Sequence, residues 1–154
     1  MYQSLLKCTG CGFVTAKIPG ASQDFAALYN EGYFTGDEYV DYVGDKKVIQ
    51  RNMKRWLKIV TEYVSEGLLV EIGSAYGFFL EEAQNHFQVI GYDVSEEAVE
   101  YANTVLKVPS RCQDFLGDQS LTHSSVDSVA MWDVIEHVDK PDRYFERAGE
   151  VLRD

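Results

Sequence analysis

An acid and a run of small residues form the stretch of this sequence best suited to hold a ligand. Glu71 lies in a short apolar run, and Gly73, Ala75 and Gly77 follow it at alternate positions. Small residues let the backbone of a strand-to-helix turn approach a ligand closely, and open α/β sheets bind ligands at such turns. The segment VEIGSAYGFFL (70–80) is therefore predicted to form one wall of a binding site.

The spacing of the small residues separates two classes of ligand. The dinucleotide-binding fingerprint G-x-G-x-x-G would need small residues at positions 73, 75 and 78. Position 78 is Phe, so the third glycine of that fingerprint is absent. A nicotinamide-dependent oxidoreductase is disfavoured on this ground, and it stays open as the alternative from another enzyme class.

Composition and charge narrow the class of protein. The chain has 154 residues, 45% of them hydrophobic and 25% charged, as expected for one globular domain with a core. A net charge of −11 would repel a nucleic-acid backbone, and no apolar run approaches membrane-spanning length. With three cysteines and no signal-peptide pattern, we expect a cytoplasmic protein without disulfides, and without a nucleic-acid or membrane partner.

Strand and helix patterns alternate from residue 45 onward. The predicted elements are a helix at 45–63, a strand at 68–72, a helix at 77–86, a strand at 87–92, a helix capped by Ser95, strands at 110–112 and 126–132, and a helix from Pro141 to the end. The last two helices are expected to turn apolar residues inward: Ala98, Ala102, Val105 and Leu106, and then Tyr144, Phe145, Ala148, Val151 and Leu152. Such alternation predicts an α/β fold with a parallel sheet.

Four sequence motifs accompany the ends of these strands in order. They are VEIGSAYG (70–77), VIGYDVSEEAVEYA (89–102), CQDF (112–115) and VAMWDVIEHVDKP (129–141). Together they resemble the motifs of the class I S-adenosylmethionine-dependent methyltransferases, with Ala75 in place of the middle glycine of G-x-G-x-G. The resemblance implies a Rossmann-like parallel sheet, S-adenosylmethionine as cofactor and methyl transfer to a small-molecule acceptor.

The resemblance also implies which residues contact the cofactor. Asp93 would accept both ribose hydroxyls, since a carboxylate has two acceptor oxygens. Asp114 and Phe115 would meet the adenine amino group and flank its ring, although Asp114 could instead simply cap a turn. Trp132, expected to be partly core, and Asp133 would lie beneath the methionine part. The full predicted set is Glu71, Gly73, Ser74, Ala75, Gly77, Asp93, Val94, Asp114, Phe115, Trp132 and Asp133.

An oxygen acceptor would benefit from a general base, and His137 is the residue best placed for that role. O-methylation is therefore favoured, while a histidine that only orders the loop stays the alternative. Asp133-x-x-Glu136-His137 resembles the E-x-x-E-H metal cluster of ubiquinone-pathway and small-RNA methyltransferases. Asp is one methylene shorter than Glu, and metal-free relatives also read D-V-I-E-H-V, so no metal site is predicted.

Residues 1–44 are predicted to form an N-terminal segment, and residues 45–154 the cofactor-binding domain. Cys8 and Cys11 form a single C-x-x-C, but tetrahedral zinc needs four ligands, so an incomplete ribbon is favoured over a zinc site. One branch of the family has a similar segment before a YNEGYF-like element that covers the cofactor. By this resemblance a lid would include Tyr29, Tyr33, Phe34, Tyr39 and Tyr42, with a satellite apolar cluster as the alternative.

The predicted sheet has four strands, whereas the sheet of the family has seven. We therefore expect a domain truncated after the fourth strand and its helix, with the strand at 126–132 left as an apolar edge. A missing C-terminal segment or the partner of a homodimer would cover that edge. The alternative function is then a cofactor-binding fragment or regulatory module without full catalytic activity.

Overall fold

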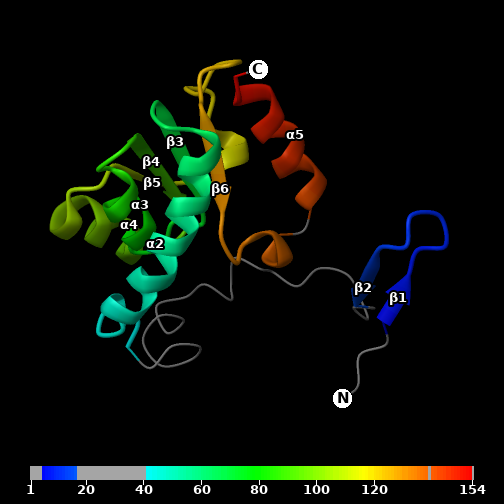
Figure 1. The fold of residues 1–154 in the computed structure, drawn as a ribbon, viewed down its shortest axis with the longest axis horizontal. Coiled ribbons are helices and arrows are strands. Elements are labelled where there is room, and N and C mark those ends of the chain that lie inside the picture. The colour runs from blue at the N-terminus through cyan, green and yellow to red at the C-terminus, as the bar shows by residue number, and fades with distance from the viewer. Residues whose placement is uncertain (1–4, 17–40, 139, 154) are drawn as a thin grey trace.

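The structure of the chain is a computed structural model that describes residues 5–16, 41–138 and 140–153. Its main part is a parallel sheet in the order β5-β4-β3-β6, with helices on both faces (Figure 1). The strands of this sheet are β3 (Leu68–Ile72), β4 (Gln88–Asp93), β5 (Ser110–Cys112) and β6 (Ser128–Met131). The predicted α/β fold with a parallel sheet is confirmed.

Helices connect and follow these strands. The α-helices are α2 (Lys46–Tyr63), α3 (Phe78–Ala83), α4 (Glu96–Tyr101) and α5 (Pro141–Val151). Shorter helical segments are the π-helix Ala102–Leu106 and the 3-10 helices Phe115–Gly117 and Ile135–His137. Ser95 caps α4 as predicted, since its hydroxyl accepts the amide of Ala98 at 3.3 Å. None of the helices that the structure describes has the length and apolar character to cross a membrane.

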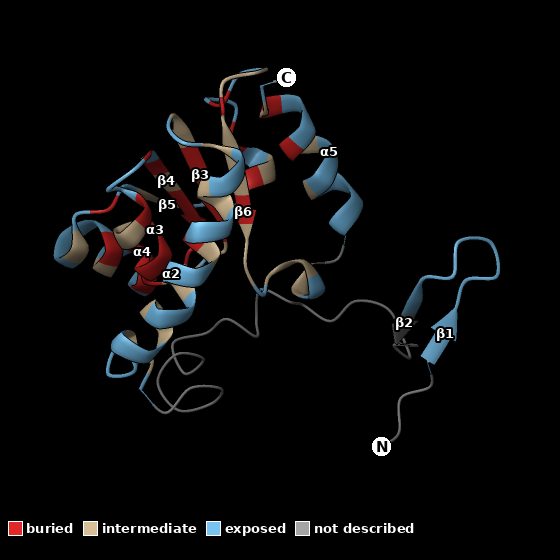
Figure 2. Cartoon of the chain, viewed as in Figure 1, coloured by how far each residue is buried: buried red, intermediate tan, exposed pale blue. Residues whose placement is uncertain are grey.

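Each face of the sheet has its own apolar cluster, because alternate residues of β3 point to opposite sides. Leu69 joins a cluster with Leu57 of α2 and Leu80 of α3. Val70 joins a second cluster that includes Val151 of α5. Figure 2 shows the buried residues gathered along the strands and on the helix sides that face them.

Two residues that were predicted to face the core are exposed. Phe145 is 59% exposed, because α5 turns Tyr144 and Val151 toward the sheet and Phe145 lies about 100° around the helix from Tyr144. Val105 is 57% exposed, because it lies in the π-helical segment, where the spacing of an α-helical stripe no longer holds.

The N-terminal part that is described is a hairpin of β1 (Leu5–Lys7) and β2 (Val14–Ala16). The predicted lid residues from 29 to 39 lie outside the described residues. Tyr42 is described, and its ring stacks on Phe78 with centroids 5.4 Å apart. The predicted boundary between residues 44 and 45 lies directly before the N-cap of α2, and the division into two domains stays a prediction.

β6 lies at one edge of the parallel sheet, and the end of the chain returns alongside the residues before it. Leu152 forms a parallel bridge with Val126, and the Arg153 amide donates to the Val126 carbonyl at 2.9 Å. Coverage of the rest of this edge by a further segment or a second copy stays a prediction.

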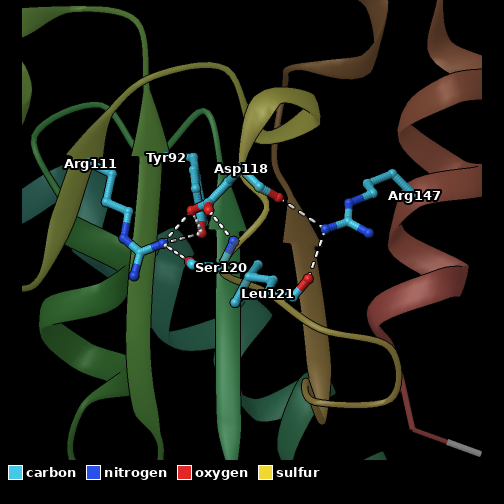
Figure 3. A network of polar contacts seen from close by, with 6 residues as sticks. All are labelled: Tyr92, Arg111, Asp118, Ser120, Leu121 and Arg147. Atoms are coloured by element: carbon cyan, nitrogen blue, oxygen red, sulfur yellow. Dashed lines mark hydrogen bonds and ion pairs between the residues drawn. The ribbon is translucent and has the colours of Figure 1, made fainter.

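A polar network centred on Asp118 fixes the loop that leads to β6 (Figure 3). The Asp118 carboxylate accepts the Tyr92 hydroxyl and the Ser120 amide, each at 2.7 Å, and forms an ion pair with Arg111. Burial alone would raise the pKa of Asp118, but these hydrogen bonds and the guanidinium hold it well below its ordinary value. The sheet therefore anchors this loop through a fully paired, buried acid.

Arg147 anchors the same loop from α5 (Figure 3). Its Nη2 donates to the carbonyl oxygens of Asp118 at 3.0 Å and Leu121 at 2.8 Å. The loop is thus held between the sheet on one side and α5 on the other.

Candidate functional site

The turn after β3 brings its backbone against the loop that follows β6. Gly73 has a φ of +70°, and a Cβ atom there would lie 2.2 Å from Cγ2 of Val134. Any side chain at position 73 would therefore force Val134 to move. The amides of Gly73 and Ser74 donate to the carbonyl of Tyr92 at 2.7 and 3.0 Å, which holds the turn against β4.

Two further small residues shape this turn. Gly77 precedes α3 with a φ of +79°, and a Cβ there would lie 3.1 Å from Cβ of Ala102. Ala75 also has a left-handed backbone, with a φ of +44°. That conformation costs a non-glycine residue about 1–2 kcal/mol, so Ala75 carries strain where the G-x-G-x-G pattern has its middle glycine.

Asp93 ends β4 beside the turn, and two backbone amides hold its carboxylate. The Ala75 amide donates to Oδ2 at 2.7 Å, and the Ser95 amide donates to Oδ1 at 2.9 Å. Burial raises the pKa of Asp93, and these amides offset part of the shift. Asp93 forms no ion pair with any described residue, and each oxygen keeps a lone pair for a further donor. The site therefore has a fixed pair of acceptors at this point.

Glu71 lies in a row of small and polar residues that crosses the sheet. In register on adjacent strands, its row contains Ser110, Gly91 and Ala130. Glu71 is 3% exposed, and its Oε2 has no hydrogen-bond partner in the described part of the chain. Burial, followed by the nearby charge of Asp93, raises the pKa of Glu71 well above its ordinary value.

Two hydroxyls close to this row also have no partner among the described residues, those of Ser74 and Ser110. Both lie around Gly91, where a Cβ atom would be 2.5 Å from Ser74 Oγ and 2.7 Å from Ser110 Oγ. Buried polar atoms are nearly always paired in native proteins, so exceptions need a reason such as a bound water, ion or ligand. Glu71 and these hydroxyls mark the region below the glycine turn as one suited to a polar ligand.

Asp114 lies on the same edge of the sheet as Asp93, since Cys112, two residues earlier, is in register with Asp93. Its Oδ1 accepts the amide of Leu116 at 3.0 Å and the hydroxyl of Tyr144 at 2.9 Å. Asp114 therefore does cap a turn, the role that the sequence left open, and its side chain stays exposed.

Two apolar residues of the predicted site differ in exposure. Phe115 is 1% exposed, and its ring packs edge-on against Tyr92 with centroids 5.5 Å apart. Its ring belongs to the core, and the role of flanking a base stays a prediction. Val94 is 54% exposed and gives an apolar surface directly beside Asp93.

The residues after β6 complete this edge of the sheet. Trp132 stacks on Trp56 of α2 with centroids 4.7 Å apart, so it is partly core, as expected. Its buried Nε1 has no hydrogen-bond partner within the described ranges. Asp133 is exposed and has a φ of +52°, a strained conformation of the kind that gathers at functional sites. His137 ends the 3-10 helix Ile135–His137.

Potential metal ligands are not grouped in the part of the chain that the structure describes. Within residues 5–16, 41–138 and 140–153, no three His, Cys, Asp or Glu side chains are placed to hold a metal ion. Cys8 and Cys11 are exposed in the hairpin turn, where hydrogen bonds from the amides of Cys11 and Gly10 lower the pKa of Cys8. Two thiols supply half of a tetrahedral set.

From the sequence, no role in the site was expected for three residues of this region: Gly91, Ser110 and Tyr144. Gly91 could have been found from the sequence, because a glycine inside a strand often marks a close approach of another group. Ser110 and Tyr144 could not, since their places depend on strand register and on the packing of α5.

A comparison with protein families identifies the chain. The family model described as "Methyltransferase domain" matches residues 70–154. The chain belongs to this methyltransferase family. The matched range of the methyltransferase domain contains all the predicted cofactor-binding residues. No curated protein is similar enough in sequence to count as a relative.

Solved structures share the fold of this methyltransferase domain. Magnesium protoporphyrin IX methyltransferase from Synechocystis PCC 6803, with bound SAM, has a TM-score of 0.61 and 19% identity, over 86% of this chain and 74% of that one. The YcgJ protein from Bacillus subtilis has a TM-score of 0.59 and 18% identity, over 68% of this chain and 47% of that one. A SAM-dependent methyltransferase from Thermotoga maritima is described as a possible histamine N-methyltransferase. It has a TM-score of 0.53 and 24% identity, over 71% of this chain and 56% of that one.

These likenesses confirm the Rossmann-like fold that the four motifs predicted. The chain spans only part of the length of each of the three proteins, from 47% of the YcgJ protein to 74% of the magnesium protoporphyrin IX methyltransferase.

Proposed function

We propose that this methyltransferase domain binds S-adenosylmethionine at the carboxyl ends of β3, β4, β5 and β6, and transfers its methyl group to a small-molecule acceptor. The observation that carries the proposal is the carboxylate of Asp93, fixed by the amides of Ala75 and Ser95 at 2.7 and 2.9 Å. A carboxylate held in this way, with lone pairs remaining on both oxygens, suits the two hydroxyls of a ribose.

The surroundings of Asp93 fit this cofactor better than a dinucleotide. S-adenosylmethionine has no phosphate, and neither Asp93 nor Glu71 is paired with a cation in the described residues. Phe78, at the third glycine position of the dinucleotide fingerprint, is 2% exposed and stacked on Tyr42. The unpartnered Oε2 of Glu71 gives a polar contact that an amino-acid moiety could use, directly or through water.

The assigned roles follow the order of the strands. When bound, the cofactor supplies an electrophilic methyl group on its sulfonium sulfur. We assign the ribose to Asp93, the adenine amino group to Asp114, and the methionine part to Trp132 and Asp133. The other proposed contacts are Glu71, Gly73, Ser74, Ala75, Gly77, Val94 and Phe115.

For the acceptor, we propose a hydroxyl, and we assign His137 as the general base that would take its proton. The names of two structural neighbours, which refer to a porphyrin and to histamine, support a small-molecule acceptor but not the choice of oxygen. A cytoplasmic location stays a prediction from the sequence.

Calorimetric titration with S-adenosylmethionine, S-adenosylhomocysteine and NAD tests the proposal. We expect micromolar binding of the first two ligands and no binding of NAD. Binding of NAD alone would contradict the proposal and favour the oxidoreductase alternative. Binding of S-adenosylhomocysteine without turnover on any hydroxylated acceptor would favour a module that holds the cofactor without catalysis.

A further inference from the structure

Tyr144 lies on α5, outside the glycine turn and the strand ends, yet its hydroxyl contacts a residue of the proposed site. It donates to Asp114 Oδ1 at 2.9 Å, and the same oxygen accepts the Leu116 amide at 3.0 Å. Asp114 Oδ2 accepts no hydrogen bond from any described residue. One carboxylate oxygen thus fixes the side chain, and the other remains available to a ligand.

The bond from Tyr144 gives Asp114 a restraint that its own turn does not. Asp114 is exposed, and the contact with Leu116 is a local cap within the same turn. The contact with Tyr144 comes from a different element, 30 residues later in the chain. Two bonds from two directions restrict the rotation of a short, exposed carboxylate more than the cap alone.

Tyr144 is itself well held. It is half-buried against the apolar cluster on the α5 face of the sheet. One turn further along α5, Arg147 donates to the carbonyls of Asp118 and Leu121 (Figure 3). α5 therefore contacts the segment 114–121 near both of its ends. Burial and then the hydrogen bond to Asp114 raise the pKa of Tyr144, so its hydroxyl remains a donor at neutral pH.

We infer that Tyr144 is a positioning residue for base recognition: it orients Asp114 so that Oδ2 accepts the 6-amino group of adenine. The inference rests on the proposed function. A 6-oxo purine presents an acceptor where adenine presents a donor, so a fixed carboxylate repels it. Tyr144 therefore sets how strongly the site prefers an adenine cofactor to its 6-oxo counterpart.

The test compares the affinity of the whole chain for S-adenosylhomocysteine and for S-inosylhomocysteine, its 6-oxo analogue, by calorimetry. In Tyr144→Phe we expect affinity for S-adenosylhomocysteine to fall about threefold to tenfold, while affinity for the 6-oxo analogue stays unchanged or rises. In an Asp114→Ala background, Tyr144→Phe should change neither affinity. Tyr63→Phe is the control, because Tyr63 is 85% exposed at the end of α2.

The outcomes separate a positioning role from a merely structural one. The inference is overturned if Tyr144→Phe loses affinity equally for both ligands, so that the ratio of the two affinities stays unchanged. It is also overturned if Tyr144→Phe changes that ratio in the Asp114→Ala background. If the unaltered chain binds neither ligand, the proposed function fails as well. If it prefers S-adenosylhomocysteine and Tyr144→Phe keeps that preference, only the inference fails.

Discussion

Glu71 and Asp118 are both buried acids of this domain, but their surroundings differ. Asp118 accepts hydrogen bonds from Tyr92 and Ser120 and pairs with Arg111, so its pKa lies below the ordinary value. Glu71 has an oxygen without a partner in the described residues, and burial raises its pKa. The carboxylate of Asp118 is saturated by the chain itself, which is typical of a structural acid. The region around Glu71 is incomplete, which is typical of a ligand site.

The two acids should affect the pH dependence of stability in opposite directions. The folded pKa of Asp118 is depressed, so its contribution is present above the unfolded pKa and is lost as pH falls through the folded pKa. The folded pKa of Glu71 is raised, so its contribution is present below the unfolded pKa and is lost as pH rises through the folded pKa. At neutral pH, Asp118 therefore stabilises the fold and Glu71 destabilises it.

The largest expected effect is the loss of stability in Asp118→Ala. The substitution leaves the Tyr92 hydroxyl without its acceptor and Arg111 without its ion pair, and such losses cost about 2–3 kcal/mol. Urea unfolding at pH 7 measures the change, with the exposed Glu100→Ala as control. Affinity for S-adenosylhomocysteine should stay within a few-fold. A variant as stable as the unaltered chain would mean that the network around Asp118 is not structural.

A smaller effect of opposite sign is expected for Glu71→Gln. Removing an ionisable group whose folded pKa is raised should stabilise the fold at pH 7. The gain is about 1.4 kcal/mol for each pKa unit by which the folded value exceeds the unfolded value, counted up to pH 7. The slope of stability against pH between pH 5 and 7 should also become flatter, as followed by urea unfolding. Cofactor affinity should fall at the same time. A stability loss at pH 7 would place Glu71 in the same structural class as Asp118.

The smallest effect concerns the strain in the glycine turn. Ala75→Gly should raise stability by at most about 1 kcal/mol, because glycine adopts the left-handed backbone without steric cost. Cofactor affinity should stay within a few-fold, since the turn already accepts one methyl group.

Ala75→Val should abolish binding by blocking the approach of the backbone. Normal binding by the Val variant in a titration would show that the ligand does not lie against this turn.

Much of the fold could be predicted because it depends on short-range patterns. The alternation of apolar runs located β3 to β6, and Ser95 and Pro141 marked the starts of helices. The exposure of Phe145 and Val105 could not be predicted from periodicity alone. It depends on which side of α5 meets the sheet and on the π-helical segment after α4.

The candidate site also has features that the sequence could predict and features that it could not. Asp93 could be predicted because it follows the glycine turn at a fixed spacing and ends a strand. The hydrogen bond from Tyr144 to Asp114 could not, because 30 residues separate the partners and only the packing of α5 joins them. The left-handed backbone of Ala75 could not be predicted from its own residue type, since alanine is rare in that conformation.

The affinity of Asp93→Ala for S-adenosylhomocysteine tests the central claim most directly. Each charge-assisted hydrogen bond to a ribose hydroxyl contributes about 1.5–3 kcal/mol, so affinity should fall at least about tenfold, which is about 1.4 kcal/mol. Calorimetric titration gives the affinity, thermal unfolding shows that the variant is folded, and Asp142→Ala, an exposed acid on α5, is the control. An unchanged affinity in folded Asp93→Ala would contradict the assignment of the ribose to this carboxylate.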